Sequence, residues 1–570
     1  MTPDFNKALI NGVERVAAWS DVLDDINVFP VADGDTGRNL IASLTPLRYL
    51  EENQEDTIYS LLMSARGNSG NIAAQFFSGL LDSESYTTLA QAVASGRDKA
   101  LKAVRQPVAG TMLTVLDDLV DFLNTRDFEN SVEYVDRIMD VLEESVRTTP
   151  ELLPELKQAG VVDSGALGLF IFLEGFFRRL IGQHNGFRSI PTIFQGKLEI
   201  ESSYQAEEEE GYCIDTVIQQ SAENKETIER LSQQGESVVV IPHKDFIKVH
   251  LHADNYHEAK AQIESLGDVV RWEDDNLASQ INDFRRQQQK GTVHIMTDAA
   301  GSVTRENARE LGLTLLDSYI IAGKKSLPET IFSPEELYRT MLKGTRVSTS
   351  QASAFERHEY YRRVVNQYEH VLYLCVGSVF TGNYDVAMEW KAQNDPEDRL
   401  TIIDTGAASG RLGSIALATG RFATQTHDPQ AVVDYAHKVV ATSREFIFLD
   451  RLKYLAAGGR MPKAKAVFGE LLRVKPIVSP TAEGVIKVGT AKNRKGQLKF
   501  ALEKFKEAFD ENDSPFVMLE YSNNRDWVET VVKREIKARC PQAETILQPL
   551  SLTSAVHMGP GTWAMAYIPS

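Results

Sequence analysis

The chain has 570 residues, of which 42% are hydrophobic and 25% are charged. These are ordinary values for folded globular proteins, and they exclude a collagen-like, fibrous or wholly disordered chain. The length predicts about three or four domains. The 61 basic residues against 80 acidic ones give a net charge of −19. So acidic a protein is a poor general ligand of nucleic acids and anionic membranes, because their phosphates repel it.

The cysteines and the N-terminus indicate the compartment. Cys213, Cys375 and Cys540 are too few for a disulfide framework and suit a reducing environment. The first residues contain no basic segment followed by an apolar stretch, so we expect no signal peptide. The most apolar run, Leu167–Phe177, contains Glu174 and is shorter than the about 20 residues of a spanning helix. We expect a cytoplasmic protein with no nucleic-acid partner and no stable membrane insertion.

The first part of the chain, up to about residue 195, has a helical pattern. Apolar residues recur at three- and four-residue spacing in Asp117–Leu123, Tyr134–Val146 and Leu167–Leu180. Glycine-rich loops lie between the helical stretches, and loops are where a helical domain places a ligand site. The acidic run Glu207–Glu210 that follows is typical of a solvated linker.

The pattern changes in residues 211–287, which predict a small α+β unit. Strands are expected at Ser237–Ile241 and Phe246–Leu251, and helices at Tyr256–Leu266 and Asn276–Gln289.

From Gly291 onward the predicted strands and helices alternate, which is the α/β pattern. The strands are Thr292–Met296, Val371–Val376 and Leu400–Ile403, and the helices include Pro334–Lys343 and Pro429–Ser443. Ligands of such sheets bind at the carboxyl ends of the strands.

The most informative motif is NVFPVADGDTGRN. Asp33 and Asp35 flank a glycine, so their carboxylates can converge on one hard cation, and Mg²⁺ takes one or two protein carboxylates with phosphate oxygens and water. Asn27 and Asn39 add neutral oxygen donors. The alternative is an Asx-type turn before a helix that starts near Thr36.

Three further loops rich in small residues accompany this motif. Arg66–Gly70 opens a predicted helix, where backbone N–H groups can bind phosphate. Gly110–Met112 and Asp163–Ala166 lie between other helices. The chain has no GxxxxGK[ST] loop, and each of the three loops alone is a weak signal. Together they indicate a nucleotide held by loops at one end of a helical barrel.

These motifs resemble the nucleotide-binding domain shared by the ADP-binding subunit of dihydroxyacetone kinase and the kinase subunit of bacterial fatty acid kinase. The segments ARGNSG, AGTMLTV and VDSGALGL follow in the family's order, and NVFPV-x-DGDTG is similar to the fatty acid kinase branch. The resemblance covers roughly residues 5–195. It implies an all-α, eight-helix barrel with ATP and two Mg²⁺ ions at its open end.

The resemblance also implies roles for individual residues. Asp33 and Asp35 become catalytic Mg²⁺ ligands, with Asn27 in the place of a third ligand. The dihydroxyacetone branch has a further aspartate upstream of the pair, where this chain has Val28. The implied nucleotide-binding set is Asn27, Thr36, Asn39, Asn68, Ser69, Gly70, Gly110, Thr111, Asp163 and Gly165, with Ser69 and Thr111 on the phosphates.

A second motif combines Cys213, His250 and His252. Period-two alternation puts both histidines on one face of their strand, and with the cysteine they form a set that suits Zn²⁺ and leaves a fourth position open. The alternative is a pair of half-buried strand histidines, because Cys213 lies 37 residues before His250. GYCIDT and IKVHLHADN resemble the middle domain of the kinase component of bacterial fatty acid kinase, which implies a metal site and a homodimer.

In the last part of the chain, hydroxyl-bearing turns follow the strands. Thr349, Ser350 and Ser378 stand there, and clustered hydroxyls can bind a carboxylate. Arg460 follows two glycines, and His557 precedes a tight turn. A basic patch surrounds Arg460, for which a solvated helix face or linker is the alternative. It consists of Arg451, Lys453, Arg460, Lys463, Lys465, Arg473 and Lys475, against only Glu470.

These segments resemble, in order, the DegV family of bacterial fatty-acid-binding proteins over about residues 290–570. The resemblance implies two α/β lobes that clamp a fatty acid, with its carboxylate on the hydroxyls and with Arg460 and His557 supporting the head group. Two departures bear on the pocket. Ala352 replaces the proline of TSQPS, and Phe380 stands within the segment that is usually SSGLSGT.

The whole chain is therefore expected to hold a kinase domain (1–200), a middle domain (201–288) and a DegV-like domain (289–570). The implied activity is that of a single-chain fatty acid kinase, a phosphotransferase that converts ATP and a fatty acid into ADP and an acyl phosphate. An acyltransferase would consume the product. Arg460 would steady the attacking head group. The alternatives are a kinase of a small hydroxylated substrate, such as a triose, and a non-catalytic lipid-binding regulator.

Overall fold

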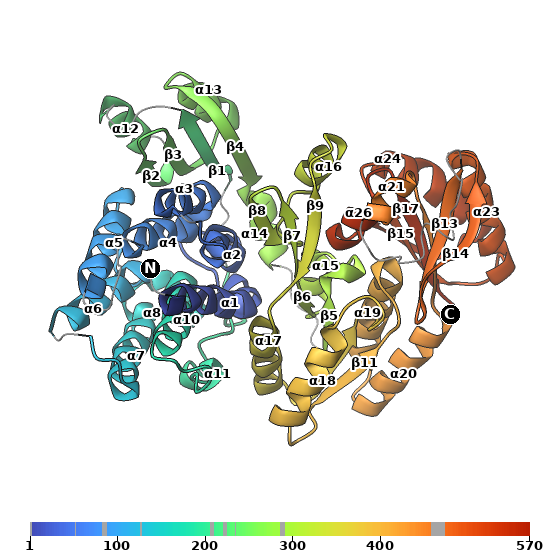
Figure 1. Cartoon of the computed structure of the whole chain (residues 1–570), viewed down its shortest axis with the longest axis horizontal. Helices are drawn as coiled ribbons and strands as arrows, with labels where there is room; N and C mark the ends of the chain where they lie inside the picture. The colour runs from blue at the N-terminus through green and yellow to red at the C-terminus, as the bar shows by residue number, and fades with distance from the viewer. Residues whose placement is uncertain are drawn as a thin grey trace. The chain divides into compact units, whose positions relative to one another are not determined.

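The computed structural model forms two compact units, Met1–Arg286 and Gln287–Ser570. Each is described by itself (Figure 1). The residues that the structure describes are 3–51, 53–81, 88–125, 128–205, 210–219, 225–233, 235–285, 291–457 and 474–569.

The first region of the first unit is all helical. Its helices are α1 (Pro3–Asp25), α2 (Thr36–Leu44), α3 (Gln54–Ser64), α4 (Gly67–Leu80), α5 (Leu89–Ala103), α6 (Met112–Thr125), α7 (Val132–Arg147), α8 (Thr149–Leu152), α9 (Pro154–Ala159), α10 (Ser164–Leu180) and α11 (Ile190–Ile193). The three helices expected from apolar spacing lie within α6, α7 and α10.

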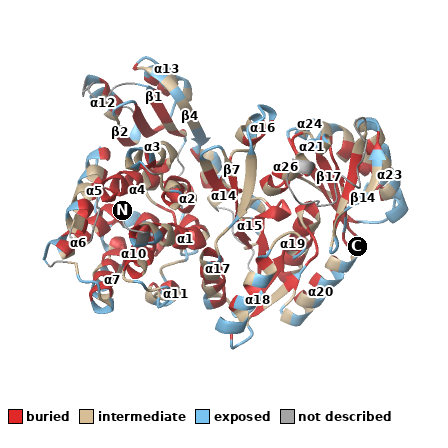
Figure 2. Cartoon of the chain, in the orientation of Figure 1, coloured by how far each residue is buried: buried red, intermediate tan, exposed pale blue. Residues whose placement is uncertain are grey.

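Helix α10 is the centre of this region. Every residue in it except Arg179 is buried, as Figure 2 shows along its length. Helix α1 packs closely on it. A Cβ atom at Gly175 would lie 3.1 Å from the carbonyl oxygen of Asn11, so glycine permits the close approach of the two backbones. The long apolar run of the sequence is therefore a buried core helix.

The middle region of the first unit is an antiparallel sheet with the strand order β2-β3-β1-β4. Its elements are β1 (Tyr212–Gln219), α12 (Lys225–Ser232), β2 (Glu236–Pro242), β3 (Ile247–Ala253), α13 (Tyr256–Glu264), β4 (Asp268–Asn276) and α14 (Leu277–Arg285). One face of the sheet buries Ile214, Val249 and Leu251 with Leu231 of α12 and Ile263 of α13. Alternation places Cys213, His250 and His252 on the opposite face.

That opposite face is attached to the helical region. Lys248 of β3 is buried, and its ammonium group donates to the carbonyl oxygens of Leu62 (3.2 Å) and Ala65 at the end of α3. Arg271 of β4 donates to the carbonyl of Met63. These cations cap the last carbonyls of α3, which have no partners inside the helix.

The second unit alternates strands and helices in its first half. The elements are β5 (His294–Asp298), η3 (Ala299–Gly301), α15 (Arg305–Glu310), β6 (Thr314–Leu316), β7 (Ser318–Ala322), β8 (Lys325–Pro328), α16 (Pro334–Leu342), β9 (Val347–Gln351), α17 (Ala354–Gln367), β10 (Val371–Cys375), α18 (Asn383–Asn394), β11 (Leu400–Asp404), α19 (Ser409–Ala423) and α20 (Pro429–Thr442). A parallel sheet has the order β11-β10-β5-β6, and a small antiparallel sheet has the order β8-β7-β9.

The second half of this unit is built on a mixed sheet with the order β14-β13-β12-β17-β15-β16. Its elements are β12 (Arg444–Phe448), α21 (Leu452–Ala457), β13 (Lys475–Thr481), β14 (Gly484–Ala491), α23 (Arg494–Ala508), β15 (Phe516–Tyr521), α24 (Arg525–Trp527), the π-helical η4 (Val528–Lys533), α25 (Arg534–Arg539), β16 (Glu544–Pro549), α26 (Leu552–Met558) and β17 (Trp563–Ile568). Strands β15 and β16 are parallel, and the other pairings are antiparallel.

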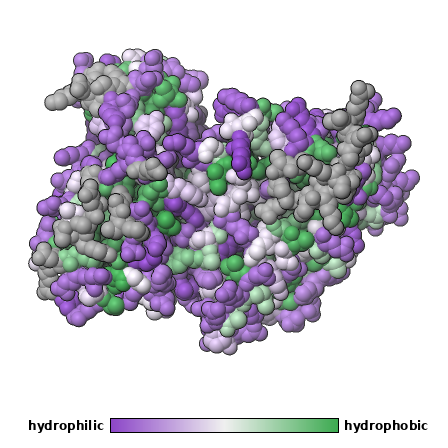
Figure 3. Space-filling model, in the orientation of Figure 1, coloured by the Kyte–Doolittle hydropathy of each residue, from purple (hydrophilic) through white to green (hydrophobic). Residues whose placement is uncertain are grey.

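The expected fold class is confirmed: a helical region, a small α+β region and an α/β region with parallel and mixed sheets. No helix among the described residues is long and apolar enough to cross a membrane. The face of the molecule in Figure 3 carries mostly hydrophilic side chains, with hydrophobic ones scattered among them.

Candidate active site

The acidic motif forms the loop between α1 and α2. Gly34 adopts φ +64°, a left-handed conformation that favours glycine, and it lets the chain turn between the two aspartates. Asn27 donates from Nδ2 to Oδ1 of Asp33 (3.0 Å) and to the carbonyl of Val31 (2.8 Å). The hydroxyl of Thr36 donates to Oδ1 of Asn27. The asparagine therefore holds the loop and one of its carboxylates in place.

Asp35 occupies the N-cap position of α2, yet its side chain makes no capping hydrogen bond. Asp24 has this role instead, since its Oδ1 accepts from the backbone nitrogens of Gly37 (2.7 Å) and Arg38 (3.2 Å). The alternative interpretation of the motif is an Asx-type turn before a helix that starts near Thr36. The helix does begin at Thr36, but the side chain of Asp35 does not cap it. Asp35 is left to face the pocket.

The electrostatics of the loop suit a cation. Burial, and then the neighbouring charge of Asp35, raise the pKa of Asp33 well above its usual value. Arg38 opposes this rise. Two carboxylates held together in a poorly solvated place repel each other, and a divalent cation would relieve the repulsion. The two carboxylates fit Mg²⁺. Asn27, the expected third ligand, turns its Nδ2 to Asp33 and its Oδ1 to the hydroxyl of Thr36.

The loop before α4 forms a second wall. Gly67 adopts φ +59°, and a Cβ atom there would lie 2.3 Å from Nδ2 of Asn39, so a side chain has no room. Helix α4 begins at this residue, and Gly67, Asn68 and Ser69 of its first turn line the same pocket as the acidic loop. Such a helix N-terminus suits phosphate oxygens.

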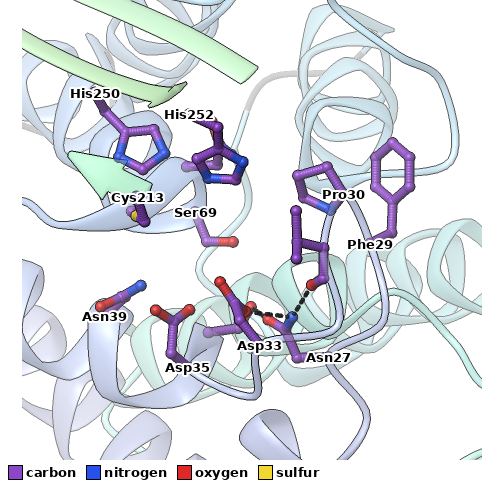
Figure 4. A pocket seen from close by; sticks show the side chains of 14 residues that line it. Asn27, Phe29, Pro30, Asp33, Asp35, Asn39, Ser69, Cys213, His250 and His252 are labelled. Atoms are coloured by element: carbon purple, nitrogen blue, oxygen red, sulfur yellow. Dashed lines mark hydrogen bonds between the residues drawn. The ribbon is translucent and has the colours of Figure 1, made fainter. Parts of the chain in front are cut away.

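These parts meet in one pocket. Its lining residues are Asn27, Phe29, Pro30, Val31, Asp33, Asp35, Thr36, Asn39, Gly67, Asn68, Ser69, Cys213, His250 and His252. Figure 4 shows Asn27, Asp33 and Asp35 on one side and Cys213, His250 and His252 across from them, with Ser69 between. The first two sequence motifs thus belong to a single site.

Strand register explains how the cysteine reaches the histidines. Strands β1 and β3 are antiparallel, and Cys213 is directly opposite His252. The sulfur and one ring nitrogen of each histidine all lie within 4.8 Å of one another, and all three residues are buried. The 37-residue separation in the sequence disappears when the strands pair.

The chemistry of this trio fits zinc. Nε2 of His250 is buried and has no hydrogen-bond partner among the described residues. Burial, and then His250, lower the pKa of His252 to about 3, which keeps its ring neutral as zinc binding requires. Burial and the nearby acidic residues raise the pKa of the Cys213 thiol, and a bound cation would act in the opposite direction.

The remaining expected nucleotide residues do not line this pocket, though some adjoin it. A Cβ atom on Gly165 would lie 3.2 Å from Oγ of Ser69, and Gly70 packs on Ser43. Asp163 caps α10 through the backbone nitrogen of Ala166 (2.7 Å), and burial raises its pKa to about 7.

The loop at Gly110 and Thr111 packs against the end of α8 and is held by its own hydrogen bonds. Gly110 adopts φ +88°, and a Cβ atom there would lie 2.8 Å from Cβ of Leu152. The hydroxyl of Thr111 donates to the carbonyl of Val108 (2.9 Å). Contact of Thr111 with a phosphate stays a prediction.

In the second unit, the residues expected to bind a carboxylate fall into different environments. Oγ1 of Thr349 lies 3.3 Å from Nε2 of His557, so these two meet. Ser350 is half-buried and donates to the carbonyl of Gln351 (3.0 Å). Ser378 gives both its hydroxyl (2.5 Å) and its backbone N–H (3.0 Å) to the carboxylate of Asp404. Arg460 lies outside the described residues.

Two members of the basic patch at residues 451–475 have acidic partners. Lys475 donates to Oδ1 of Asp450 (2.6 Å), and Arg451 lies 3.6 Å from Oδ2 of the same residue. Residues 458–473 lie outside the described residues.

Sequence reasoning missed two acidic residues at these sites. Asp215 stands two residues after Cys213 on the same face of β1, a signal that alternation could have supplied. Asp404 ends β11, beside the end of β10 in the same parallel sheet, which is where polar side chains of neighbouring strands meet.

Comparison with known families covers most of the chain. Residues 30–178 match the DAK2 domain, residues 209–284 the FakA-like middle domain of fatty acid kinases, and residues 292–570 the DegV family of uncharacterised proteins. The chain joins a DAK2 domain, a FakA-like middle domain and a DegV-family domain. The pocket is lined by the first two of these domains.

Two staphylococcal relatives of this DAK2–DegV chain are described as uncharacterised proteins. A Staphylococcus saprophyticus protein is 32% identical over an alignment of 333 residues, which covers 52% of this chain and 59% of the relative. A Staphylococcus aureus protein is 30% identical over an alignment of 363 residues, which covers 57% of this chain and 65% of the relative. The chain therefore spans less than two thirds of the length of these relatives.

Solved structures resemble the DegV-family half. A fatty-acid-binding DegV family protein from Thermus thermophilus has a TM-score of 0.45 and 24% identity, with 49% of this chain and 99% of that chain covered. DegV, a fatty acid binding protein from Bacillus subtilis, has a TM-score of 0.45 and 18% identity, with 49% of this chain and all of that chain covered.

Proposed function

We propose that this chain is a fatty acid kinase that transfers the γ-phosphoryl group of ATP to a fatty acid carboxylate. One observation carries the proposal: the acidic loop and α4 N-terminus of a DAK2 domain share a pocket with the Cys-His₂ trio of a FakA-like middle domain. A DAK2 domain implies nucleotide binding. The middle-domain match and the DegV-family domain support a fatty acid as the acceptor.

The reaction asks little of the protein in acid–base chemistry. A fatty acid is ionised at neutral pH, because carboxyl groups titrate near pH 4 to 5, so the attacking oxygen needs no general base. The task is to position the two reactants and to balance the charge that collects on the transferred group. Mg²⁺ would supply positive charge at the phosphates when bound.

The residues of the pocket divide this task. Asp33 and Asp35 would hold the cation, and Asn27 keeps Asp33 in its orientation. The backbone N–H groups of Asn68 and Ser69, at the start of α4, would hold phosphate oxygens. The Cys-His₂ trio faces the acidic loop from across the pocket and would border the acceptor carboxylate.

In the DegV-family unit, Thr349 and His557 would hold the carboxylate before transfer, because their polar atoms already meet. Ser378 could join them only by giving up a donor to Asp404. Arg460 is proposed to steady the attacking head group. Dimerisation through the middle domain, and an acyltransferase that consumes the product, belong to the same proposal.

The test is turnover of ATP with defined acceptors. The purified protein receives ATP, Mg²⁺ and oleate, and hydroxylamine traps any acyl phosphate as a hydroxamate for mass spectrometry. We expect hydroxamate and ADP in equal amounts. The variant Asp35→Asn should lose both products and still bind oleate. Asp121→Asn, an exposed aspartate on α6, is the matched control and should retain activity.

The other outcomes separate the alternatives. ADP release with dihydroxyacetone and none with oleate would indicate a small-substrate kinase. Bound lipid without any ATP turnover would indicate a lipid-binding regulator.

A further inference from the structure

Asp215 lies on the same face of the sheet as the Cys-His₂ trio. In the β1–β3 register, Cys213 is opposite His252 and Asp215 is opposite His250. The four side chains therefore form a square on one face of the sheet, because residues two apart on a strand share a face. Asp215 is not counted in the Cys-His₂ trio, because its carboxylate oxygens are engaged by His250, Gly67 and Asn71.

One of these partners is His250. Oδ2 of Asp215 lies 3.3 Å from Nδ1 of the ring. Both carboxylate oxygens of Asp215 already accept hydrogen bonds from N–H groups of the helical region. The carboxylate is therefore the acceptor towards His250 as well, and Nδ1 carries the proton. Nε2, which is buried and has no hydrogen-bond partner among the described residues, then presents a lone pair.

The other partners of Asp215 are on the nucleotide loop. The backbone nitrogen of Gly67 donates to Oδ2 (2.9 Å), and Nδ2 of Asn71 donates to Oδ1 (3.1 Å). Asn71 also donates to the carbonyl of Gly67 (2.7 Å), which ties the first turn of α4 together. One carboxylate therefore touches both the first residue of α4 and the ring of His250.

We propose that Asp215 is a positioning residue that fixes the Nδ1–H tautomer of His250 and sets its ring in register with the phosphate-binding end of α4. The role rests on the proposed function, in which α4 holds phosphate and the trio borders the acceptor. The carboxylate keeps the reactive nitrogen of His250 turned to the pocket while it anchors Gly67. A histidine partner of this kind orients the ring of a metal ligand or of a catalytic group alike.

The experiment compares Asp215→Asn with the wild type in the full chain. The control is Glu273→Gln, since Glu273 of β4 binds Arg66 (3.1 Å) and joins the same sheet to the same loop without an interaction with His250. In protein labelled with ¹⁵N-histidine, ring NMR identifies which nitrogen of His250 is protonated, with His250→Gln providing the assignment. We expect Nδ1–H in the wild type and the control, and loss of this pure tautomer in Asp215→Asn.

Kinetics supplies the second readout. For acyl phosphate formation we expect kcat to fall at least about tenfold in Asp215→Asn, with KM for ATP within about twofold of the wild type. If Asp215 only anchors the loop, KM for ATP rises and kcat is retained, and the proposal is overturned. A wild-type His250 protonated on Nε2 would overturn it as well.

If Asp215→Asn does not fold, Asp215→Glu replaces it in the experiment, because glutamate keeps the carboxylate. This variant should restore the Nδ1–H signal of His250 in part, and a missing Nδ1–H signal would count against the positioning role. The NMR result is independent of the reaction. A wild type that makes no acyl phosphate but shows the Asp215-dependent tautomer refutes the kinase proposal and leaves the positioning role intact.

Discussion

Each unit of the protein holds a pair of neighbouring acidic side chains, and the surroundings of the two pairs differ. Asp33 and Asp35 line a pocket, where Asn27 donates to Asp33 and the charge of Arg38 acts on it. Glu445 of β12 and Glu520 of β15 are fully buried on either side of β17. The pair in the pocket, here called the open pair, can bind a cation from solution. The fully buried pair, here called the closed pair, must find its hydrogen-bond partners within the protein.

The closed pair does so with hydroxyls and a proton. Oε1 of Glu520 accepts from the hydroxyls of Ser302 (2.6 Å) and Ser409 (3.1 Å), and Oε2 of Glu445 accepts from the backbone nitrogen of Arg411 (3.2 Å). Burial raises the pKa of both carboxyls, and for Glu445 the neighbouring Glu520 adds to it. The oxygens without another partner are Oε1 of Glu445 and Oε2 of Glu520. A proton shared between the two acids joins these oxygens by a hydrogen bond. Paired acids thus indicate a site only where solvent or ligand can reach them.

Replacing one acid of each pair by its amide should abolish turnover in the pocket pair and leave it nearly unchanged in the buried pair. Asp33→Asn removes a negative charge from the pocket, so we expect acyl phosphate formation to fall by about 10³-fold or more. Glu520→Gln keeps a neutral, hydrogen-bonding side chain beside Glu445, and turnover should stay within about twofold. Loss of activity in both variants would show that the closed pair also serves the reaction.

Truncation of the closed pair is the next largest effect. Glu520→Ala leaves the hydroxyls of Ser302 and Ser409 without their acceptor, and we expect the free energy of unfolding of the second unit to fall by about 2–4 kcal/mol. Urea unfolding followed by tryptophan fluorescence measures it, because Trp563 lies in that sheet. Glu520→Gln is the matched control and should unfold near the wild-type midpoint.

A third buried acid sharpens the comparison through pH. Burial, and then Asp317, raise the pKa of Glu329 to about 8, against 4.5 for a free side chain. The folded state binds this proton more tightly than the unfolded state does. Its contribution to stability is complete below about pH 4.5 and is lost as the pH rises to about 8.

We therefore expect Glu329→Gln to flatten the fall in unfolding free energy between about pH 5 and pH 8, a change on the order of a few kcal/mol. Thermal unfolding at several pH values gives the profile. Glu335→Gln, at an exposed position on α16, should leave the profile as in the wild type. An unchanged profile in Glu329→Gln would place the proton on another group.

The smallest expected effect concerns Ser378. If its hydroxyl turns from Asp404 to a fatty acid carboxylate, Ser378→Ala should weaken oleate binding about three- to tenfold and leave ATP binding unchanged. Asp404→Asn should then tighten oleate binding, because a competing negative charge is gone. Fluorescent fatty acid displacement measures both. Equal affinities in all three proteins would remove Ser378 from the lipid site.

The sequence predicted what depends on local pattern. Apolar spacing identified α6, α7 and α10, and alternation placed His250 and His252 on one face. It could not supply the partner of Cys213, because strand register is set by tertiary pairing and β1 was not recognised as a strand.

The same limit applies to the hydrogen bonds within the sites. The motif around Asp35 is equally compatible with a self-capped turn, and only the approach of Asp24 from α1 frees Asp35. Ser378 has the residue type of a carboxylate ligand, and the neighbouring strand determines that a protein carboxylate already accepts from it. Residue type predicted the chemistry, and the fold determined which groups remain available for it.

The cations that cap α3 also bear on where the chain can be divided. Lys248 and Arg271 of the middle sheet close the last carbonyls of a helix in the preceding domain. Cutting the chain near residue 200 would strip α3 of both caps and leave Lys248 facing water from what had been an interior surface. Cutting after residue 286 keeps them. We therefore expect the smallest fragment for reassembly or domain exchange to be the whole first unit, with the DAK2 domain and the middle domain kept together.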